Sequence, residues 1–312
     1  MLELIKEIEK LKKEKNAVIL AHNYQPAEIQ DLADYIGDSL GLSFEASKTE
    51  ATLIFFCGVL FMAETASIIS PNKKVVIPEL EAGSSLSSKI NLEQLREWKS
   101  NHPDSVVVSY VNTSAEVKSE SDYCVTSSNA VKIVQSISKG EKILFLPDKF
   151  LGRYIEAATG RKMEIWNGSC HVHEKIGDII FAKAQNLHPN TKFLIHPECG
   201  CSSSCLMKAN IYFDCSNIHI SSREEMINFV KNSNSNEFVI ATEVGIIHRL
   251  KKIKPEAKIF PLSEKAVCEY MKMISLEKLR NALRDEVQEI RVPEETAVKA
   301  KLPIERMLAL SD

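Results

Sequence analysis

The 312-residue chain lacks several features that mark common functional classes. It contains no apolar run of about twenty residues, the length that a transmembrane helix needs. The first six residues, Met1 to Lys6, begin an amphipathic helix and include no apolar segment of signal-peptide length. A net charge of −3 and an isoelectric point near 6.3 leave no basic excess for nucleic acid or an anionic membrane. We therefore expect a soluble, cytoplasmic protein with neither of these partners.

The eight cysteines do not suggest a disulfide framework. In a chain without a signal peptide we expect a reducing compartment, where cysteines are core residues, catalytic groups or metal ligands. Cys57 and Cys124 stand inside apolar runs, so we interpret them, together with Cys215, as core residues. The remaining cysteines are candidates for chemistry.

Short apolar, β-branched runs occur in three groups of four, separated by helix-length segments. They cover residues 18–21, 35–36, 52–56 and 74–77, then 106–109, 123–125, 143–146 and 163–165, then 193–195, 218–220, 238–241 and 258–260. Strands alternating with helices predict parallel sheets covered on both faces. The sequence therefore predicts an α/β protein with three pseudo-repeated αβα domains, each containing a short four-stranded parallel sheet, around a central pseudo-threefold active-site cavity.

We place the domain boundaries at 1–86, 87–172 and 173–274, with a cysteine-rich insertion at 199–215 in the third domain. Helices are expected to start at Pro26, at Asn91 and at Ser222, where acidic residues follow in the first turn. The tail from residue 275 to 312 differs from the repeats. It predicts a helix through 276–279 and a last helix formed by 303–307, both packing back on the body.

Polar markers follow equivalent strands of the three groups. In the first copy His22 precedes Ser39 by 17 residues, and in the second Tyr110 precedes Ser127 by the same distance. In the third copy the separation from His196 to the matching serine, Ser222, is 26 residues, because the cysteine-rich insertion lies between them. Since parallel strands end at one edge of a sheet, we expect these side chains to converge on the central cavity.

A third marker, a cysteine, follows each serine in two of the copies. Cys170 stands 43 residues after the serine of the second copy, and Cys268 stands 46 residues after that of the third. The corresponding position of the first copy is Ser84, 45 residues after its serine. Three thiolates far apart in sequence could hold a cubane iron–sulfur cluster with one open iron that acts as a Lewis acid. The alternative is that these are ordinary buried cysteines, but their equivalent positions favour ligation.

The strand-end residues can move protons and bind anions. His196 and Glu198 could act as base and acid, and His22 and Tyr24 add two more proton-handling groups. The alternative for the first pair is a strand-end histidine beside a surface glutamate. The three serines stand at strand-to-helix turns, where hydroxyls and helix N-terminal amides bind phosphate or carboxylate, although serine also caps helices generally. Together these residues predict a small ligand with more than one acidic group.

Nine segments in unbroken order resemble the quinolinate synthase family, from about residue 16 to the C-terminus. They are residues 21–25, 37–40, 58–59 with 61–65, 110–112, 147–148 with 151–152, Cys170 with His173, 196–199, 242–246 with His248, and 271–272 with 276–279. The resemblance implies three αβα domains around a central site. It also implies the condensation of iminoaspartate with dihydroxyacetone phosphate to quinolinate, the pyridine precursor of NAD, by an iron–sulfur-dependent transferase.

The resemblance also implies a set of site residues. Cys170 and Cys268 match ligands of a [4Fe-4S] cluster, and the third ligand falls on Ser84. Tyr24 and Glu198 match proton-transfer residues. Substrate contacts match the following positions: His22, Ser39, Tyr110, Asn112, Ser127, His196, Glu198, Ser222 and Arg223. An L-aspartate oxidase or dehydrogenase is the expected upstream partner, because it would supply iminoaspartate.

Two positions depart from the family pattern. Ser84 stands where the family has a cysteine, and a serine alkoxide is a harder and more basic iron ligand than a thiolate. Arg223 stands where the family usually has threonine after serine, and a guanidinium could hold a carboxylate or a phosphate.

Two alternatives to a cluster-dependent synthase remain open. The first is a cluster-deficient relative that binds a dicarboxylate or a triose phosphate without turnover, and Ser84 is the reason to consider it. The second is a zinc or thiol sensor that uses Cys199, Cys201 and Cys205, whose short spacing and soft sulfur ligands resemble a zinc or redox site.

Overall fold

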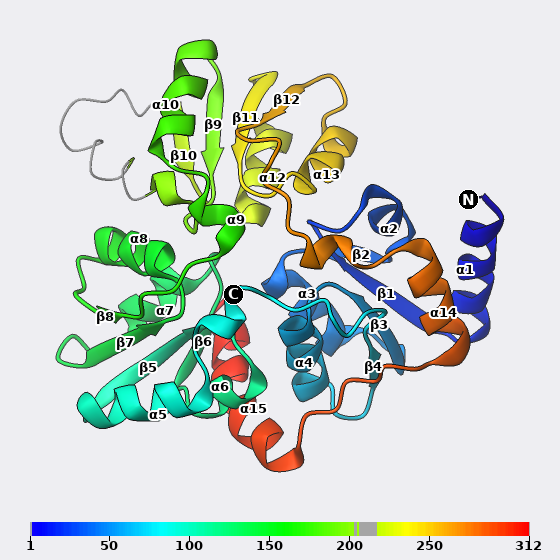
Figure 1. The fold of residues 1–312 in the computed structure, drawn as a ribbon, viewed down its shortest axis with the longest axis horizontal. Coiled ribbons are helices and arrows are strands. Elements are labelled where there is room, and N and C mark those ends of the chain that lie inside the picture. Colours follow the sequence, from blue (N-terminus) through cyan, green and yellow to red (C-terminus); the bar gives the residue numbers. More distant parts are fainter. Residues whose placement is uncertain (1, 203–204, 206–216, 312) are drawn as a thin grey trace.

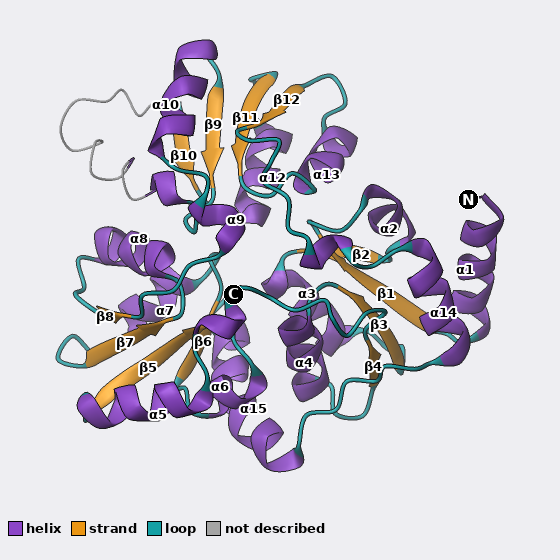
Figure 2. Cartoon of the chain, viewed as in Figure 1, coloured by secondary structure: helices purple, strands orange, loops and turns teal. Residues whose placement is uncertain are grey.

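The computed structural model describes residues 2–202, 205 and 217–311 and contains three separate four-stranded sheets. Their strand orders are β2-β1-β3-β4, β6-β5-β7-β8 and β10-β9-β11-β12, so the same connectivity occurs three times. All neighbouring strands are parallel. The three sheets, each flanked by helices, surround a common centre (Figures 1 and 2). The predicted fold class is thus confirmed.

The first unit is built on strands β1 to β4. Its strands are β1 (Ala17–His22), β2 (Tyr35–Gly37), β3 (Leu53–Cys57) and β4 (Lys74–Val76). Its helices are α1 (Leu2–Glu14), α2 (Ala27–Leu32), α3 (Ser39–Lys48) and α4 (Leu60–Ile69), followed by the 3₁₀ turn η1 (Ser87–Lys89).

The second unit is built on strands β5 to β8. Its strands are β5 (Ser105–Tyr110), β6 (Tyr123–Val125), β7 (Lys142–Leu146) and β8 (Glu164–Ile165). Its helices are α5 (Leu92–Asn101), α6 (Ala115–Ser119), α7 (Ala130–Ser136) and α8 (Lys149–Thr159).

The third unit is built on strands β9 to β12. Its strands are β9 (Lys192–Ile195), β10 (Ile218–Ile220), β11 (Glu237–Ala241) and β12 (Lys258–Pro261). The accompanying helices are α9 (His171–Glu174), α10 (Asp178–Leu187), α12 (Arg223–Asn232) and α13 (Ile246–Ile253), with the 3₁₀ turn η2 (Tyr270–Lys272). The chain ends with α14 (Leu276–Asp285) and α15 (Glu294–Ala309).

All twelve strands expected from the sequence are present, because their apolar runs suit strands that are covered on both faces. The central strands β3, β7 and β11 are buried along nearly their whole length. The expected helix starts are also confirmed: Pro26, Asn91 and Ser222 precede α2, α5 and α12, and the last two form capping boxes. The domain boundaries stay a prediction.

The first and second units repeat one side-chain device. Asp34, just before β2, accepts a hydrogen bond from the backbone N–H of Ile19 in β1 at 2.8 Å. Asp122, just before β6, accepts one from Val107 in β5 at the same distance. In each case the carboxylate accepts a backbone hydrogen bond at the start of the edge strand, where the sheet provides no carbonyl acceptor. The two units are therefore alike in detail as well as in topology.

The last helix differs from the sequence expectation. The sequence predicted a helix formed by 303–307, but α15 begins nine residues earlier, at Glu294, and Pro303 lies inside it. Pro293 caps this helix, and Glu294 and Glu295 occupy the first turn, where acidic side chains favour a helix start. The helix packs against α6, β6 and α4, while α14 packs against α1. Burial of one face of α15 offsets the hydrogen bond that the proline cannot donate.

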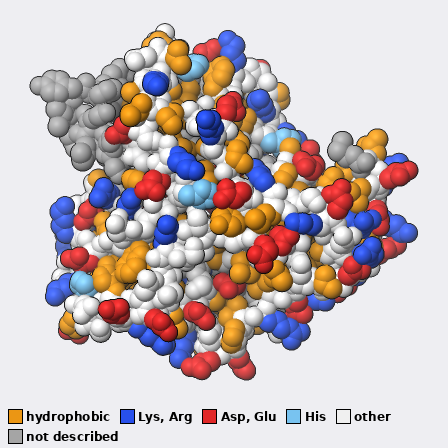
Figure 3. All heavy atoms as spheres, in the orientation of Figure 1, with side chains coloured by type: hydrophobic (Ala, Val, Ile, Leu, Met, Phe, Trp, Pro, Cys, Tyr) orange, Lys and Arg blue, Asp and Glu red, His pale blue; other side chains and the backbone are white. Residues whose placement is uncertain are grey.

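No helix among the described residues is both long enough and apolar enough to cross a membrane. On the face shown in Figure 3, the Lys and Arg side chains are interspersed with Asp and Glu side chains.

We expect α15 to be required for the stability of the whole chain. Ile304 is fully buried in it, so Ile304→Ala should lower the free energy of unfolding by about 2–5 kcal/mol through lost burial and a cavity. Leu302, two residues earlier, is 52% exposed and provides the control, with an expected change within about 0.5 kcal/mol for Leu302→Ala. Urea denaturation measures both. Equal losses for the two variants would contradict the packing described here.

Candidate functional site

One pocket lies where the three units meet, and its roughly 500 Å³ of empty space includes the open mouth. Nine of the thirteen site residues predicted from the sequence line it, and they come from all three units. They are His22, Tyr24, Ser39, Ser84, Asn112, Cys170, Glu198, Arg223 and Cys268. The other four, Tyr110, Ser127, His196 and Ser222, are buried behind this lining. The structure thus brings the predicted residues together, while their roles stay predictions.

Two histidines at equivalent strand ends share one local geometry. The Nδ1 atom of His22 accepts a hydrogen bond from the backbone N–H of Tyr24 at 3.1 Å. His196 Nδ1 accepts one from the backbone N–H of Glu198 at 3.4 Å. With Nδ1 accepting, a neutral ring carries its proton on Nε2. His196 therefore donates from Nε2 to Ser127 Oγ, 3.1 Å away, and His22 presents an N–H donor.

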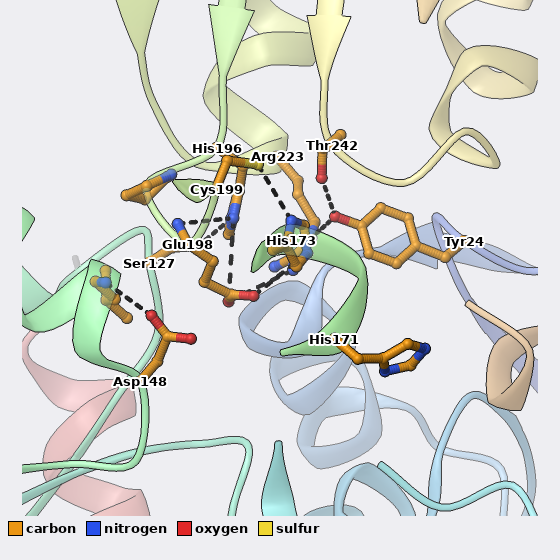
Figure 4. Close-up of polar contacts among 12 residues, drawn as sticks. Tyr24, Ser127, Asp148, His171, His173, His196, Glu198, Cys199, Arg223 and Thr242 are labelled. Atoms are coloured by element: carbon orange, nitrogen blue, oxygen red, sulfur yellow. Dashed lines mark hydrogen bonds and ion pairs between the residues drawn. The ribbon is translucent and has the colours of Figure 1, made fainter. Parts of the chain in front are cut away.

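The carboxylate of Glu198 is at the centre of the polar network (Figure 4). It is 1% exposed. The hydroxyl of Tyr110 donates to its Oε1 atom. A guanidinium nitrogen of Arg223 lies 3.6 Å from the same oxygen, and His173 Nε2 lies 3.3 Å from Oε2. These partners come from β5, α12 and α9, so three separate elements stabilise one buried charge.

Arg223 also contacts Tyr24. Its Nε donates to the Tyr24 hydroxyl at 2.5 Å, and its guanidinium lies 4.8 Å from the centre of the ring. Thr242 bonds the same hydroxyl. Burial raises the pKa of Tyr24 and of Tyr110, although the positive charge of Arg223 opposes the shift. Both phenols are therefore protonated at neutral pH and available as hydrogen-bond donors.

Burial also keeps the site histidines neutral. It lowers the pKa of His173 to about 4, against the opposing effect of the Glu198 carboxylate. Burial, with a further contribution from Arg223, lowers the pKa of His22 and of His196 well below the usual value. At neutral pH each of these rings can donate one proton and accept another.

The remaining polar residues divide into two kinds. Ser39 starts α3, and Asn112 has a buried amide oxygen without a hydrogen-bond partner, so both can receive a ligand in the cavity. Ser222 instead caps α12, because its hydroxyl accepts from the backbone N–H of Glu225 at 3.4 Å. Its predicted substrate contact therefore has no direct support from the geometry.

The three candidate ligand positions have one backbone arrangement in common. The sulfur of Cys170 faces the backbone N–H groups of Val172 and His173, and that of Cys268 faces those of Tyr270 and Met271. The hydroxyl oxygen of Ser84 accepts from the backbone N–H of Ser87 at 3.2 Å. Each ligand atom is thus met by N–H groups two or three residues downstream, as is common for cluster ligands. The donor set fits an iron–sulfur cluster at two positions and offers oxygen at the third.

A mononuclear metal centre fits less well. Among the described residues, the His, Cys, Asp and Glu trio with all ligand atoms within 4.8 Å of one another is His173, His196 and Glu198. Glu198 already interacts with Arg223 and Tyr110, so a cation there would meet a positive charge. The cysteines of the sensor hypothesis do not belong to this trio. Cys199, Cys201 and Cys205 are buried, and Cys215 lies outside the described residues.

The sequence reasoning assigned no role to two acidic residues that hold the cysteine loops. Asp148, two residues after β7, accepts from the backbone N–H of Cys170, and Glu243, two residues after β11, accepts from that of Cys268 at 3.1 Å. Burial raises the pKa of both carboxyl groups. Both residues stand two positions after equivalent strands, and both lie in segments that carried the family resemblance. The sequence therefore contained a signal that could have identified them.

His173 was also missed as a functional residue, although it stands three residues after Cys170. Its Nε2 atom faces Glu198, while its Nδ1 atom lies 3.2 Å from the sulfur of Cys199. The sulfur in turn donates to the backbone oxygen of Ala241 at 3.1 Å. The sequence gives no sign of this contact, since the two residues are 26 positions apart.

Comparison with known proteins gives one consistent result. A family model described as quinolinate synthetase A protein matches residues 6–309. A Pyrobaculum aerophilum protein named quinolinate synthase is 50% identical over 308 residues, covering 97% of this chain and 98% of its own. A Thermus thermophilus protein of that name is 49% identical, with 98% and 97% covered. A Synechocystis protein of that name is 45% identical, with 99% and 96% covered.

The buried histidines predict acid sensitivity. Their pKa is lower in the folded chain than the unfolded value of about 6.5, so the unfolded chain binds protons first as the pH falls. Their contribution is fully present above pH 6.5 and decreases toward about pH 4 for His173. Each contributes up to about 1.4 kcal/mol per pH unit in this window. Urea unfolding of the metal-free chain between pH 7.5 and 5 should show this slope.

A histidine variant at the site checks the assignment. His196→Gln should reduce the slope by about one histidine's share. An unfolding free energy that is independent of pH across the window would contradict this assignment.

Proposed function

This chain belongs to the quinolinate synthetase A protein family, and we propose that it condenses iminoaspartate with dihydroxyacetone phosphate to form quinolinate. Its relatives are named quinolinate synthase, an enzyme of NAD biosynthesis. Iminoaspartate is unstable, so an L-aspartate oxidase or dehydrogenase would have to supply it nearby. We place the reaction in the cytoplasm, where such a supply and reduced thiols would coexist.

One observation carries the proposal: acid–base groups, anion-binding groups and two thiols line the same cavity. Both substrates are small and anionic, and their condensation requires several proton transfers. A cavity that contains one guanidinium, neutral imidazoles and a phenol can bind such molecules and exchange protons with them. Separate locations for these groups would not support the reaction.

Arg223 is the strongest candidate for an anion anchor, because its guanidinium lines the cavity and is buried. A carboxylate or phosphate group of a substrate could bind to the Arg223 guanidinium beside the Glu198 carboxylate. Asn112 offers a free amide oxygen to a hydroxyl or amine, and the Nε2–H of His22 offers a donor. These groups would orient the two substrates before bond formation.

Glu198 is the best placed group for proton transfer. Its carboxylate lines the cavity and is hydrogen-bonded to Tyr110, so a proton accepted from substrate can be shared with its neighbours. The Tyr24 hydroxyl accepts a hydrogen bond from Arg223 Nε and keeps its own proton, which it would supply to a leaving oxygen. His196 lies behind the cavity lining, where its ring is fully buried and hydrogen-bonded to Ser127. In this fixed position it would help to hold Glu198 in place.

We assign the cofactor site to Cys170, Cys268 and Ser84. A [4Fe-4S] cluster bound there would supply a Lewis-acidic iron that assists the loss of water. Asp148 and Glu243 hold the backbone of the two cysteine loops, and the downstream N–H groups face the ligand atoms. Burial raises the pKa of the Cys170 thiol to about 12, so binding must release its proton.

Ser84 supports a second candidate function, in which the chain binds its ligands without turnover. A neutral hydroxyl gives iron a weaker ligand than a thiolate, whereas Arg223 and Asn112 need no metal to bind an anion. In this form the chain would retain the ligand pocket and lose the cluster.

We expect Glu198→Gln to lower quinolinate formation by about 10²–10⁴-fold, the usual contribution of a general acid–base group. The amide retains the shape but cannot accept a proton. Glu224→Gln is the matched control: Glu224 also pairs with an arginine, Arg249, at 2.6 Å, but it does not line the cavity. Product is measured with iminoaspartate generated in place by an aspartate oxidase. Unchanged activity of the first variant would refute the assignment.

Iron binding distinguishes the two candidate functions. After anaerobic reconstitution, we expect Ser84→Cys to hold about four irons and four sulfides per chain, the content of one cubane cluster. The unchanged chain should hold less and lose its iron faster to a chelator, because oxygen is the harder ligand. Iron analysis and visible absorption measure both. A variant that holds no iron would show that these positions are not a cluster site.

A further inference from the structure

The residues that directly follow the three candidate ligands contact one another. Ser85 follows Ser84, His171 follows Cys170, and Glu269 follows Cys268. The Ser85 hydroxyl lies 2.6 Å from His171 Nδ1, and Glu269 Oε2 lies 3.4 Å from His171 Nε2. One imidazole therefore connects three loops that follow the last strands of the three sheets, β4, β8 and β12.

The contact between His171 and Ser85 is the stronger of the two. Besides the ring contact, the backbone N–H of His171 donates to the same serine oxygen at 3.4 Å, so the two loops are joined twice. Glu269 approaches His171 Nε2 without hydrogen-bond geometry, and its side chain is 65% exposed. Its contribution is therefore the smaller one. The edge of the Tyr270 ring, 6.1 Å from the imidazole between centres, completes the contact with the third loop.

The arrangement does not fit a hydrolytic triad. In such triads a buried acid orients the imidazole, whereas Glu269 is exposed and His171 points away from the Glu198 network (Figure 4). Nor does the imidazole line the cavity, although Ser85 does. A position behind the lining and between the loops suits a residue that holds other residues in place.

We propose that His171 is a positioning residue that fastens the loops 84–87, 170–173 and 268–271 to one another before any metal is bound. The proposal rests on the proposed function where it concerns a cluster, because the same loops carry Ser84, Cys170 and Cys268. Three ligands that follow three different sheets can bind one cluster only if their loops keep a fixed separation. The imidazole of His171 sets this separation. Preorganisation of this kind lowers the cost of ordering the ligands at the moment of binding.

Backbone amide exchange of the metal-free chain tests the proposal without reference to iron. His171→Phe keeps a ring and removes both nitrogens, so exchange should accelerate about fivefold in 84–87 and 170–173, the factor expected for one hydrogen bond, and by a smaller factor in 268–271. His171→Asn can still reach Ser85 and should restore most of the protection. Ser85→Ala should loosen the loops more than Glu269→Gln does.

His248→Phe is the matched control. It breaks another histidine–carboxylate contact between units, 2.6 Å from Nε2 to Asp31, at a place remote from the ligand loops. It should accelerate exchange around α2 and leave the three loops unchanged. Faster exchange that is confined to 170–173 in His171→Phe would overturn the proposal.

Iron retention tests the consequence for the cofactor. In the Ser84→Cys background, adding His171→Phe should speed the loss of iron to a chelator about fivefold at an unchanged content of secondary structure. Equal rates would overturn the proposal. If Ser84→Cys alone binds no iron, the proposed cluster fails, and the exchange experiment decides the role of His171 by itself.

Discussion

The buried carboxylate of Glu198 is the constraint on which the central site depends. A charge that is 1% exposed is stable only when other groups replace its water. Here the replacements are a phenol from β5, a guanidinium from α12 and an imidazole from α9. Because Tyr110 belongs to the second unit while Glu198 and its other two partners belong to the third, these two units must close on one another to satisfy the charge. Removing any one partner leaves part of the charge uncompensated, which is costly in a buried pair.

Much of the fold could be predicted because it depends on local patterns. Twelve apolar runs predicted twelve strands, and marker spacing predicted that His22 and Ser39 would lie at one cavity. Helix boundaries were less certain where two signals competed. Pro303 resembles a helix start, but Glu294 and Glu295 begin α15 and the buried face of the helix tolerates the proline.

The contacts that hold the site could not be predicted in the same way. Asp148 and Glu243 each accept a backbone N–H from a loop more than twenty residues away, and no periodicity indicates which loop. His173 faces Glu198 and Cys199, which stand 25 and 26 residues further along the chain, and no sequence period links these positions. Such contacts depend on how the loops fold over the ends of a sheet, and the sequence pattern specifies the strands without specifying that placement.

The two departures from the family pattern act in the same electrostatic direction. Ser84 replaces a residue that would be a thiolate when it binds metal, and Arg223 adds a cation beside Glu198. Both make the cavity more positive, which favours an anionic ligand and disfavours a bound metal cation. Yet Ser84 keeps the local geometry of the cysteine positions, with its side-chain oxygen facing a downstream N–H. The substitution therefore alters the affinity of one ligand atom while the loop that presents it remains intact, so metal binding and anion binding can vary independently in this cavity.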